Sequence, residues 1–191
     1  MKINEIFYSI QGEGHFSGTP AVFIRFAGCN LKCPFCDTQH QQGREMSENE
    51  IIKEVSQYPA ELCVLTGGEP TLQVTKSFID KLHNVGLCVA IETNGTHEIP
   101  KNIDWVTLSP KSSYVARAEV KIKRANEIKF VVDETHLPET YDVVTQNLYI
   151  QPCDTGEPVR NRKINEICIN YVKQHPQWKI SLQMQKILQV R

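Results

Sequence analysis

The chain has 191 residues, of which 40% are hydrophobic and 23% charged, and this fits a single domain over residues 1–191 whose core needs no disulfide bonds. Its formal net charge of −1 and the lack of a long basic run argue against nucleic acid as a partner. The N-terminus lacks a signal-peptide layout and no apolar run reaches the ~20 residues of a membrane span, so we expect a cytoplasmic protein with reduced thiols and no membrane contact.

Short apolar segments and helical patterns begin to alternate in the first third of the chain. Residues 3–10 and 21–26 predict two strands, and the second strand leads directly into a cysteine-rich loop. Ser47 and Glu50 have the spacing of a capping box. A helix is therefore expected after Ser47, and it should end near Pro59.

The middle of the chain continues the alternation. Residues 62–66 predict a buried strand, and a helical pattern over residues 74–85 follows, with Gly86 as its stop. Residues 87–91 and 105–108 predict the next two strands.

The last third begins with a polar segment that has helix-like stretches. It leads to expected strands over residues 128–132 and 148–150, a helix over 161–175 and a final strand over 178–182. Strands that alternate with helices favour a mainly parallel sheet. The chain is too short for a complete eight-fold barrel of ~250 residues, so we expect an α/β fold of the truncated, partly open (β/α) barrel type.

Three of the seven cysteines, Cys29, Cys33 and Cys36, have the spacing C-x3-C-x2-C. Three thiolates are one fewer than a cubane iron–sulfur cluster usually takes, which leaves one iron open to a small molecule. Structural zinc normally has four protein ligands, and no fourth Cys or His stands at a regular zinc-finger spacing. The triplet therefore favours an iron–sulfur site, with a zinc or redox cysteine site as the alternative.

The remaining cysteines are dispersed along the chain. Cys63, Cys88 and Cys168 lie in apolar runs, where a thiol is expected to be buried as a small hydrophobic group. Cys153 follows a probable strand end, and its environment is left open.

A second motif, Thr66-Gly67-Gly68-Glu69-Pro70, follows the strand predicted over residues 62–66. The glycines expose backbone groups to a ligand, and the Glu69 carboxylate offers a partner for an ammonium group. Thr66 stands at the strand end, from where it can reach toward a substrate.

The cysteine loop followed by the Gly-Gly-Glu-Pro motif resembles the radical S-adenosylmethionine (SAM) superfamily. The resemblance implies that the three thiolates hold a [4Fe–4S] cluster and that the amine and carboxylate of SAM chelate the free iron. It also implies that one electron from the cluster cleaves SAM to a 5′-deoxyadenosyl radical.

Further runs narrow the resemblance, nearly end to end, to the 7-carboxy-7-deazaguanine synthase family. These runs are residues 10–14, 20–31, 36–38, 92–96, 109–111 and 151–152. The family resemblance implies conversion of 6-carboxy-5,6,7,8-tetrahydropterin to 7-carboxy-7-deazaguanine with loss of ammonia, in the pathway to queuosine and other deazapurines. It further implies Mg²⁺ as a cofactor, a homodimer, and an electron donor such as flavodoxin or ferredoxin.

The family resemblance assigns roles to individual residues. It implies catalytic roles for Arg25 and Glu13 and a Mg²⁺ contact for Thr38. The residues implied in substrate binding are Ile10, Gln11, Gly12, Arg25 and Thr66, and those implied in SAM binding are Gly68, Glu69, Ser109, Pro110, Lys111 and Gln151. A single neutral hydroxyl is a poor Mg²⁺ site, so the ion should bind well only when the substrate carboxylate completes its shell.

Several of these residues have simpler explanations. An Arg within an apolar strand needs an anionic partner, which for Arg25 is either the substrate or a core carboxylate in a structural ion pair. Ser109 and Lys111 fit a strand-end cap and a solvated lysine equally well, and Glu92 and Asn94 fit an ordinary turn. Glu13 fits both a general acid or base and a surface carboxylate.

One position departs from the family pattern. The family often has a His in its C-terminal Leu-Gln-x-His-Lys run, whereas this chain has Gln185, which donates a hydrogen bond but cannot shuttle protons at neutral pH.

Two other functions also fit the cysteine triplet: a glycyl-radical enzyme activating protein, and a non-catalytic zinc or electron-transfer protein.

Overall fold

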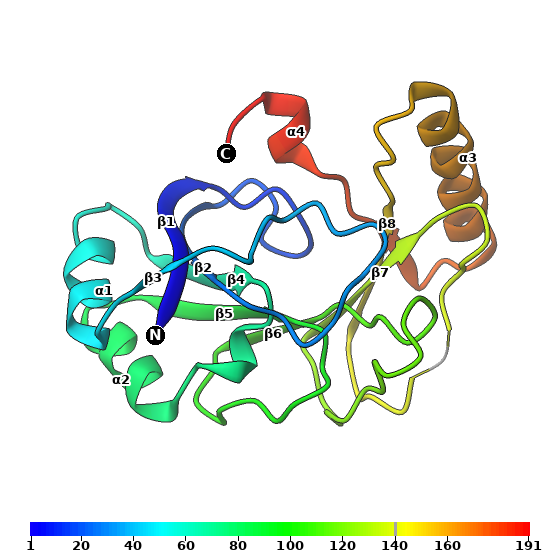
Figure 1. The fold of residues 1–191 in the computed structure, drawn as a ribbon. Coiled ribbons are helices and arrows are strands. Elements are labelled where there is room, and N and C mark those ends of the chain that lie inside the picture. The colour runs from blue at the N-terminus through cyan, green and yellow to red at the C-terminus, as the bar shows by residue number, and fades with distance from the viewer. Residues whose placement is uncertain (140) are drawn as a thin grey trace.

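One curved sheet of nine strands forms the framework of the molecule, in a computed structural model that describes residues 1–139 and 141–191 (Figure 1). The strand order is β3-β1-β2-β4-β5-β6-β7-β8-β9. β1 is antiparallel to β2 and β3, whereas all neighbouring pairs from β2 to β9 are parallel. The strands are β1 (Lys2–Ile10), β2 (Pro20–Phe26), β3 (Arg44–Glu45), β4 (Leu62–Gly67), β5 (Cys88–Thr93), β6 (Trp105–Leu108), β7 (Glu127–Val132), β8 (Asn147–Pro152) and β9 (Trp178–Ile180).

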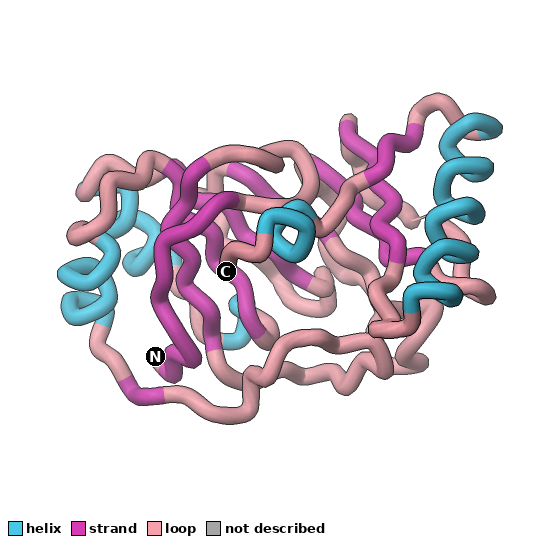
Figure 2. The backbone as a smooth tube through the Cα atoms, turned by 90° about the horizontal axis from the view of Figure 1, so that it is seen from above, coloured by secondary structure: helices cyan, strands magenta, loops and turns pink. Residues whose placement is uncertain are grey.

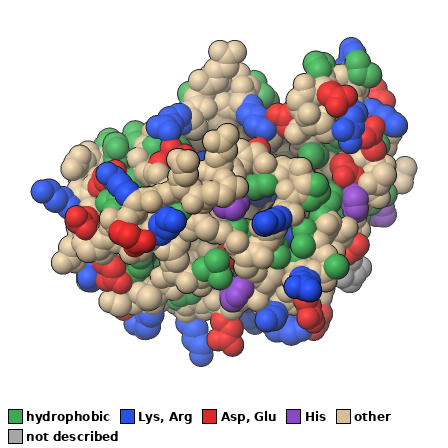
Figure 3. All heavy atoms as spheres, in the orientation of Figure 1, with side chains coloured by type: hydrophobic (Ala, Val, Ile, Leu, Met, Phe, Trp, Pro, Cys, Tyr) green, Lys and Arg blue, Asp and Glu red, His purple; other side chains and the backbone are tan. Residues whose placement is uncertain are grey.

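The longer helices cover the outer face of this sheet, and a short C-terminal helix lies over its opening (Figures 1 and 2). The outer helices are α1 (Glu48–Val55), α2 (Lys76–Asn84) and α3 (Pro158–Gln174), the C-terminal one is α4 (Met184–Leu188), and a 3-10 turn, η1, spans Pro70–Leu72. Among the described residues, no helix combines the length and the apolar character that crossing a membrane requires. Acidic and basic side chains are interspersed over the face shown in Figure 3, in keeping with the near-neutral net charge.

The alternation of side chains along each strand separates the core from the functional face. In β2, Val22 and Ile24 pack with buried residues of α1 and α2 on the outer face. Phe23 points the other way and packs with Val64 of β4 and Ala90 of β5 in a separate inner cluster. The inner face therefore has an apolar layer at this level of the sheet.

Two residues further along each strand, the same inner face becomes polar. Arg25 of β2 is paired with Thr66 of β4, and Glu92 of β5 follows Ile91, the partner of Leu65. Because these strands are parallel, their carboxyl ends share one edge of the sheet, where ligand sites of α/β folds lie. The pleat thus places polar side chains at this edge above an apolar floor.

The sequence correctly predicted all described strands except β3, and it also predicted the helices α1 to α3. The partly open barrel is confirmed, since β3 and β9 remain as two separate edges. The capping box of α1 is confirmed, with Ser47 as N-cap. The prediction of helix-like stretches before β7 was wrong, because residues 109–126 form turns and irregular backbone. This segment is held by the loop after β5, where Lys121 N–H donates to Gly95 O. The last strand ends at Ile180, and α4 and β3 were not predicted.

The dispersed cysteines are free thiols with different environments. Cys63 and Cys168 are buried as expected, and burial raises the pKa of each. Cys88 is exposed, which corrects the prediction for this residue, because it is the first residue of β5 and lies beside Asp104. Cys153 is half-buried beside the core under α3.

Candidate active site

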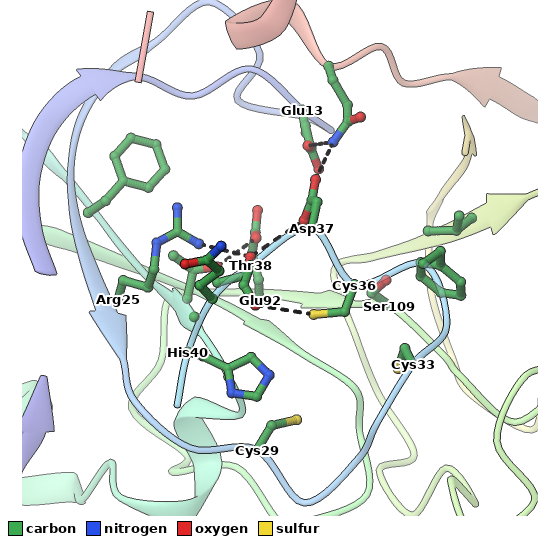
Figure 4. A pocket seen from close by; sticks show the side chains of 18 of the residues that line it. Glu13, Arg25, Cys29, Cys33, Cys36, Asp37, Thr38, His40, Glu92 and Ser109 are labelled. Atoms are coloured by element: carbon green, nitrogen blue, oxygen red, sulfur yellow. Dashed lines mark hydrogen bonds between the residues drawn. The ribbon is translucent and has the colours of Figure 1, made fainter. Parts of the chain in front are cut away.

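A cavity of about 790 Å³ lies at the carboxyl edge of the parallel strands (Figure 4). With the exception of Pro110, which is buried, all of the predicted site residues line this cavity. They are Ile10, Gln11, Gly12, Glu13, Arg25, Cys29, Cys33, Cys36, Thr38, Thr66, Gly68, Glu69, Ser109, Lys111 and Gln151. Residues from β1, from β8 and from the C-terminal segment, residues 183–191, thus meet in one chamber.

The loop that carries the cysteines, residues 28–43, is fastened at its base and on one side. Gly28 N–H donates to His40 O at 2.8 Å, which brings the two ends of the loop together. Asn30 donates to Thr96 Oγ1 at 2.9 Å and accepts from Asn94 Nδ2 at 3.1 Å. Asn94 therefore holds the cysteine loop, which is more than the turn role that its sequence context suggested.

The three thiols of this loop are spread around one side of the cavity (Figure 4). Burial raises the pKa of Cys29 and Cys33, and Cys36 is exposed. The described residues contain no group of three Cys, His, Asp or Glu side chains arranged to hold a single metal ion. A cubane takes its thiolates at separate iron corners, so three spaced soft donors without a fourth ligand fit such a cluster better than a zinc ion.

The Gly-Gly-Glu-Pro loop packs directly against the cysteine loop. Gly68 N–H donates to Phe26 O at 3.0 Å, and Glu69 N–H donates to Gly28 O at 2.9 Å. A Cβ atom on Gly68 would lie only 1.8 Å from Gly28 O. Position 68 therefore requires glycine for the contact between the two loops.

Glu69 has partners that the sequence did not indicate. Its buried carboxylate, with a residue exposure of 1%, accepts hydrogen bonds from the Thr71 hydroxyl and N–H, the Thr93 hydroxyl and the Asn94 N–H at 2.6–3.1 Å. A carboxylate that already accepts four hydrogen bonds has little capacity left for a ligand ammonium. Through these partners the carboxylate joins the loops after β4 and β5, and its contact with a ligand ammonium stays a prediction.

Lys111 is held inside the cavity. Its ammonium donates to Ser109 O at 2.8 Å and to Ser109 Oγ at 2.5 Å, and it lies 5.7 Å from the centre of the Phe35 ring. Burial lowers the pKa of Lys111 to about 8. The alternative of a solvated lysine is therefore wrong, and Ser109 is its partner.

Arg25 has an ion-pair partner and also faces the cavity. Its Nε donates to Glu5 Oε1 at 2.9 Å, and its Nη1 donates to Thr38 Oγ1 at 3.2 Å. The carboxylate is thus a partly exposed group on the neighbouring strand β1 rather than a core residue. Remaining N–H donors of the guanidinium are available to a ligand.

Glu13 and Lys129 form a close buried ion pair, in which the Lys129 side chain is 6% exposed. Lys129 Nζ also lies 3.5 Å from Glu92 Oε1. Burial by itself would raise the pKa of Glu13, but the Lys129 charge and the donors Gln183 and Gln185 lower it to about 2. Conversely, the two carboxylates hold the pKa of Lys129 above its ordinary value against the effect of burial.

The sequence reasoning missed Lys129 and assigned Glu92 only to a turn. Glu92 accepts from Gln11 Nε2 and Thr66 Oγ1, both at 3.1 Å, so it joins β5 to β4 and to the loop after β1 inside the cavity. A usable signal existed for Lys129, because it is the single charged residue in the apolar run over residues 128–132, as Arg25 is in residues 21–26. The C-terminal residues that line the cavity had no comparable periodic signal.

An open parallel sheet with a three-cysteine loop at its carboxyl edge defines a radical SAM enzyme, and the family described as the radical SAM superfamily matches residues 23–143. The chain is 47% identical over 190 residues to 7-carboxy-7-deazaguanine synthase of Bacteroides thetaiotaomicron, covering 100% of this chain and 98% of the relative. It is 35% identical to the enzyme of the same name from Haemophilus influenzae, covering 97% and 92%. The chain belongs to the 7-carboxy-7-deazaguanine synthase family.

A solved structure agrees with this assignment. The crystal structure of QueE from Escherichia coli matches with a TM-score of 0.73 and 29% identity, covering 95% of this chain and 93% of that one. Membership in this family gives the chain a [4Fe–4S] cluster, SAM and Mg²⁺ as its cofactors. The two other functions that fitted the cysteine triplet, a glycyl-radical enzyme activating protein and a non-catalytic zinc or electron-transfer protein, are set aside by these relatives.

Proposed function

We propose that this cavity binds 6-carboxy-5,6,7,8-tetrahydropterin and converts it to 7-carboxy-7-deazaguanine with release of ammonia. The observation that carries the proposal is the meeting, in one chamber, of the cysteine loop, the residues expected to hold SAM and the Arg25–Thr38 pair. When bound, the cluster and SAM supply the one-electron chemistry that removes a hydrogen atom from the substrate. The protein contributes binding, orientation and exclusion of water.

The cofactor side of the cavity is assigned to the two fastened loops. Cys29, Cys33 and Cys36 are the cluster ligands, and the backbone around Gly68 lies against the same loop. Lys111 offers its ammonium to the carboxylate of SAM, with Ser109 holding the lysine in place. Gln151, which is 7% exposed, completes this side of the chamber. Pro110 is expected to contribute through its position between Ser109 and Lys111, which both line the cavity.

The substrate side is assigned to the polar layer above the inner apolar cluster. Arg25 binds the substrate carboxylate, and Thr38, which accepts from Arg25, is the protein contact of Mg²⁺. Gln11 and Thr66 are fixed through Glu92, and they and the backbone of Ile10 and Gly12 line the pterin pocket.

Glu13 serves as a fixed hydrogen-bond acceptor. A carboxyl with a pKa of about 2 is ionised at neutral pH, so it has no proton to donate and is a weak base. Lys129, Gln183 and Gln185 keep it in one orientation, from which it accepts N–H donors of the substrate ring system. Gln185 thus acts as a neutral donor to Glu13 in this chain.

Three wider assignments accompany the proposal. The enzyme forms a homodimer, operates in the cytoplasm, and receives its electron from a flavodoxin or ferredoxin. Support for the last assignment is the exposure of Cys36 on the cysteine loop, which leaves a short path from solvent to the cluster position.

The test is an anaerobic assay of the reconstituted enzyme with SAM, Mg²⁺, a chemical reductant and the carboxylated tetrahydropterin. We expect a deazaguanine product, its loss in Cys33→Ala, and a raised KM in Arg25→Gln. A matched control is Arg44→Gln, an exposed arginine paired with Glu54 at 2.6 Å and absent from the cavity lining. SAM cleavage without any deazaguanine would overturn the proposed substrate and leave the radical SAM assignment intact.

A further inference from the structure

A second guanidinium shares the carboxylate that pairs with Arg25. Glu5 Oε1 accepts from Arg25 Nε at 2.9 Å, and Glu5 Oε2 accepts closely from Arg191 Nη2. Both guanidinium carbons lie near the Phe7 ring, at 5.6 Å for Arg25 and 5.3 Å for Arg191. Arg191, near the end of the C-terminal segment, lines the same cavity as Arg25.

This corner of the cavity carries excess positive charge. The side chains of Arg25, Arg191 and Glu5 together leave a net charge of +1. Elsewhere in the cavity the carboxylates outnumber their cations, because Glu13 and Glu92 share Lys129 and because Asp37 and Asp154 share Lys186. The corner is therefore suited to one further carboxylate.

Arg191 is free to change its partner. Its side chain is 71% exposed, whereas those of Arg25 and Glu5 are 23% and 28% exposed. Exposed ion pairs are weak, so moving this guanidinium from Glu5 to a ligand has a small free-energy cost. Its backbone stays in reach, because Ser9 Oγ donates to Arg191 O at 2.5 Å.

We propose that Arg191 is a specificity-determining residue that binds the substrate carboxylate together with Arg25. The inference rests on the proposed function, since it takes the carboxylated pterin as the ligand. Guanidinium and carboxylate match in planar fork geometry. The cavity supplies two guanidiniums beside Glu5, one from β2 and one from the C-terminal segment. Arg191 thereby couples recognition of the carboxylate to the position of the C-terminal segment.

The experiment compares two ligands on the cluster-loaded enzyme with SAM: 6-carboxypterin and pterin, which lacks the carboxyl group. Binding is followed by the fluorescence of the pterin ring, and the measured quantity is the ratio of the two Kd values. We expect Arg191→Ala to reduce the preference for 6-carboxypterin on the order of 10-fold, the size of a charge-assisted hydrogen bond. Arg191→Lys should restore part of the preference, and Arg44→Ala, a matched surface arginine, should leave it unchanged.

The ratio separates recognition from a merely structural role of the C-terminal segment. If Arg191→Ala weakens both ligands equally, or changes neither, the inference is wrong while the proposed function stands. If the unmodified enzyme shows no preference for 6-carboxypterin and forms no deazaguanine, the proposed function itself fails, and this inference fails with it.

Discussion

Lys129 balances two carboxylates of the cavity at once, Glu13 and Glu92. Replacing it by Met leaves both anions without their buried partner, and breaking such a pair typically costs about 3–5 kcal/mol of folding free energy. We predict a loss of this size for Lys129→Met in urea unfolding of the cluster-free protein. Lys163→Met is the control, because Lys163 is an exposed residue of α3 whose Nζ lies 3.5 Å from Glu134 Oε1. Loss of this exposed ion pair should change the free energy of unfolding only slightly. Equal effects of the two substitutions would contradict this account of the cavity.

The ionisation of Glu13 gives stability a pH dependence of known sign. Its pKa is depressed from 4.5 to about 2, so its contribution is present above pH 4.5 and is lost as the pH falls through about 2. The full difference corresponds to about 3 kcal/mol. We predict that Glu13→Gln flattens the acid limb of the unfolding free energy between these pH values, whereas Glu98→Gln on an exposed loop leaves it in place. An acid limb that is unchanged in Glu13→Gln would show that Lys129 does not hold this carboxylate ionised.

At the scale of elements, the contact between the loops after β2 and β4 decides where the cluster loop sits. An added methyl group at Gly68 would meet the Gly28 carbonyl at 1.8 Å, and backbone atoms cannot give way as a side chain can. We predict that Gly68→Ala retains its fold but holds less iron after anaerobic reconstitution, measured as iron and sulfide content per chain. Gly86→Ala tests backbone strain alone, since Gly86 has a φ of 86° and no atom within 4 Å of an added Cβ. Cluster retention by Gly68→Ala would show that the loops separate without consequence.

The C-terminal segment, residues 183–191, is attached to the rest of the molecule by polar contacts. Lys186 reaches Asp154 at 2.9 Å and Asp37 at 3.4 Å, and all three side chains are partly exposed. Salt weakens such pairs through screening. We predict that amide hydrogen exchange of this segment accelerates in 1 M salt, while the amides around Ile164 and Cys168 of α3, which pack on the core, keep their rate. Exchange that is insensitive to salt would indicate that apolar contacts hold the segment.

At the scale of the whole molecule, the regular part of the fold was predictable because its signals are local and periodic. β2 and β4 are short apolar runs, and α1 begins at a capping box. The conformation of the segment between β6 and β7 was not predictable from the sequence. Its turns depend on hydrogen bonds to distant residues such as Gly95 rather than on the hydrophobic pattern of the segment itself. The same holds for α4, which is five residues long and has no buried side chain.

The parts of the candidate site that lie in short sequence motifs were predictable. The parts that depend on contacts between residues far apart in the sequence were missed. The cysteine loop and Gly68 are recognisable from spacing, and both line the cavity. The hydrogen bonds of the Glu69 carboxylate to Thr93 and Asn94 were not predictable, because these partners lie more than twenty residues away. Lys129 was overlooked although a single charge in an apolar run, here residues 128–132, is the signal that identified Arg25.

The bonds from Gln183 and Gln185 to Glu13 span 170 and 172 residues of chain, and they have a consequence for biosynthesis. A ribosome releases the cysteine loop early and these two glutamines late, so a nascent polypeptide exposes its thiols long before the chamber above them is complete. Metal loading during translation would therefore take place before the cavity is complete, because its completion requires Gln183 and Gln185.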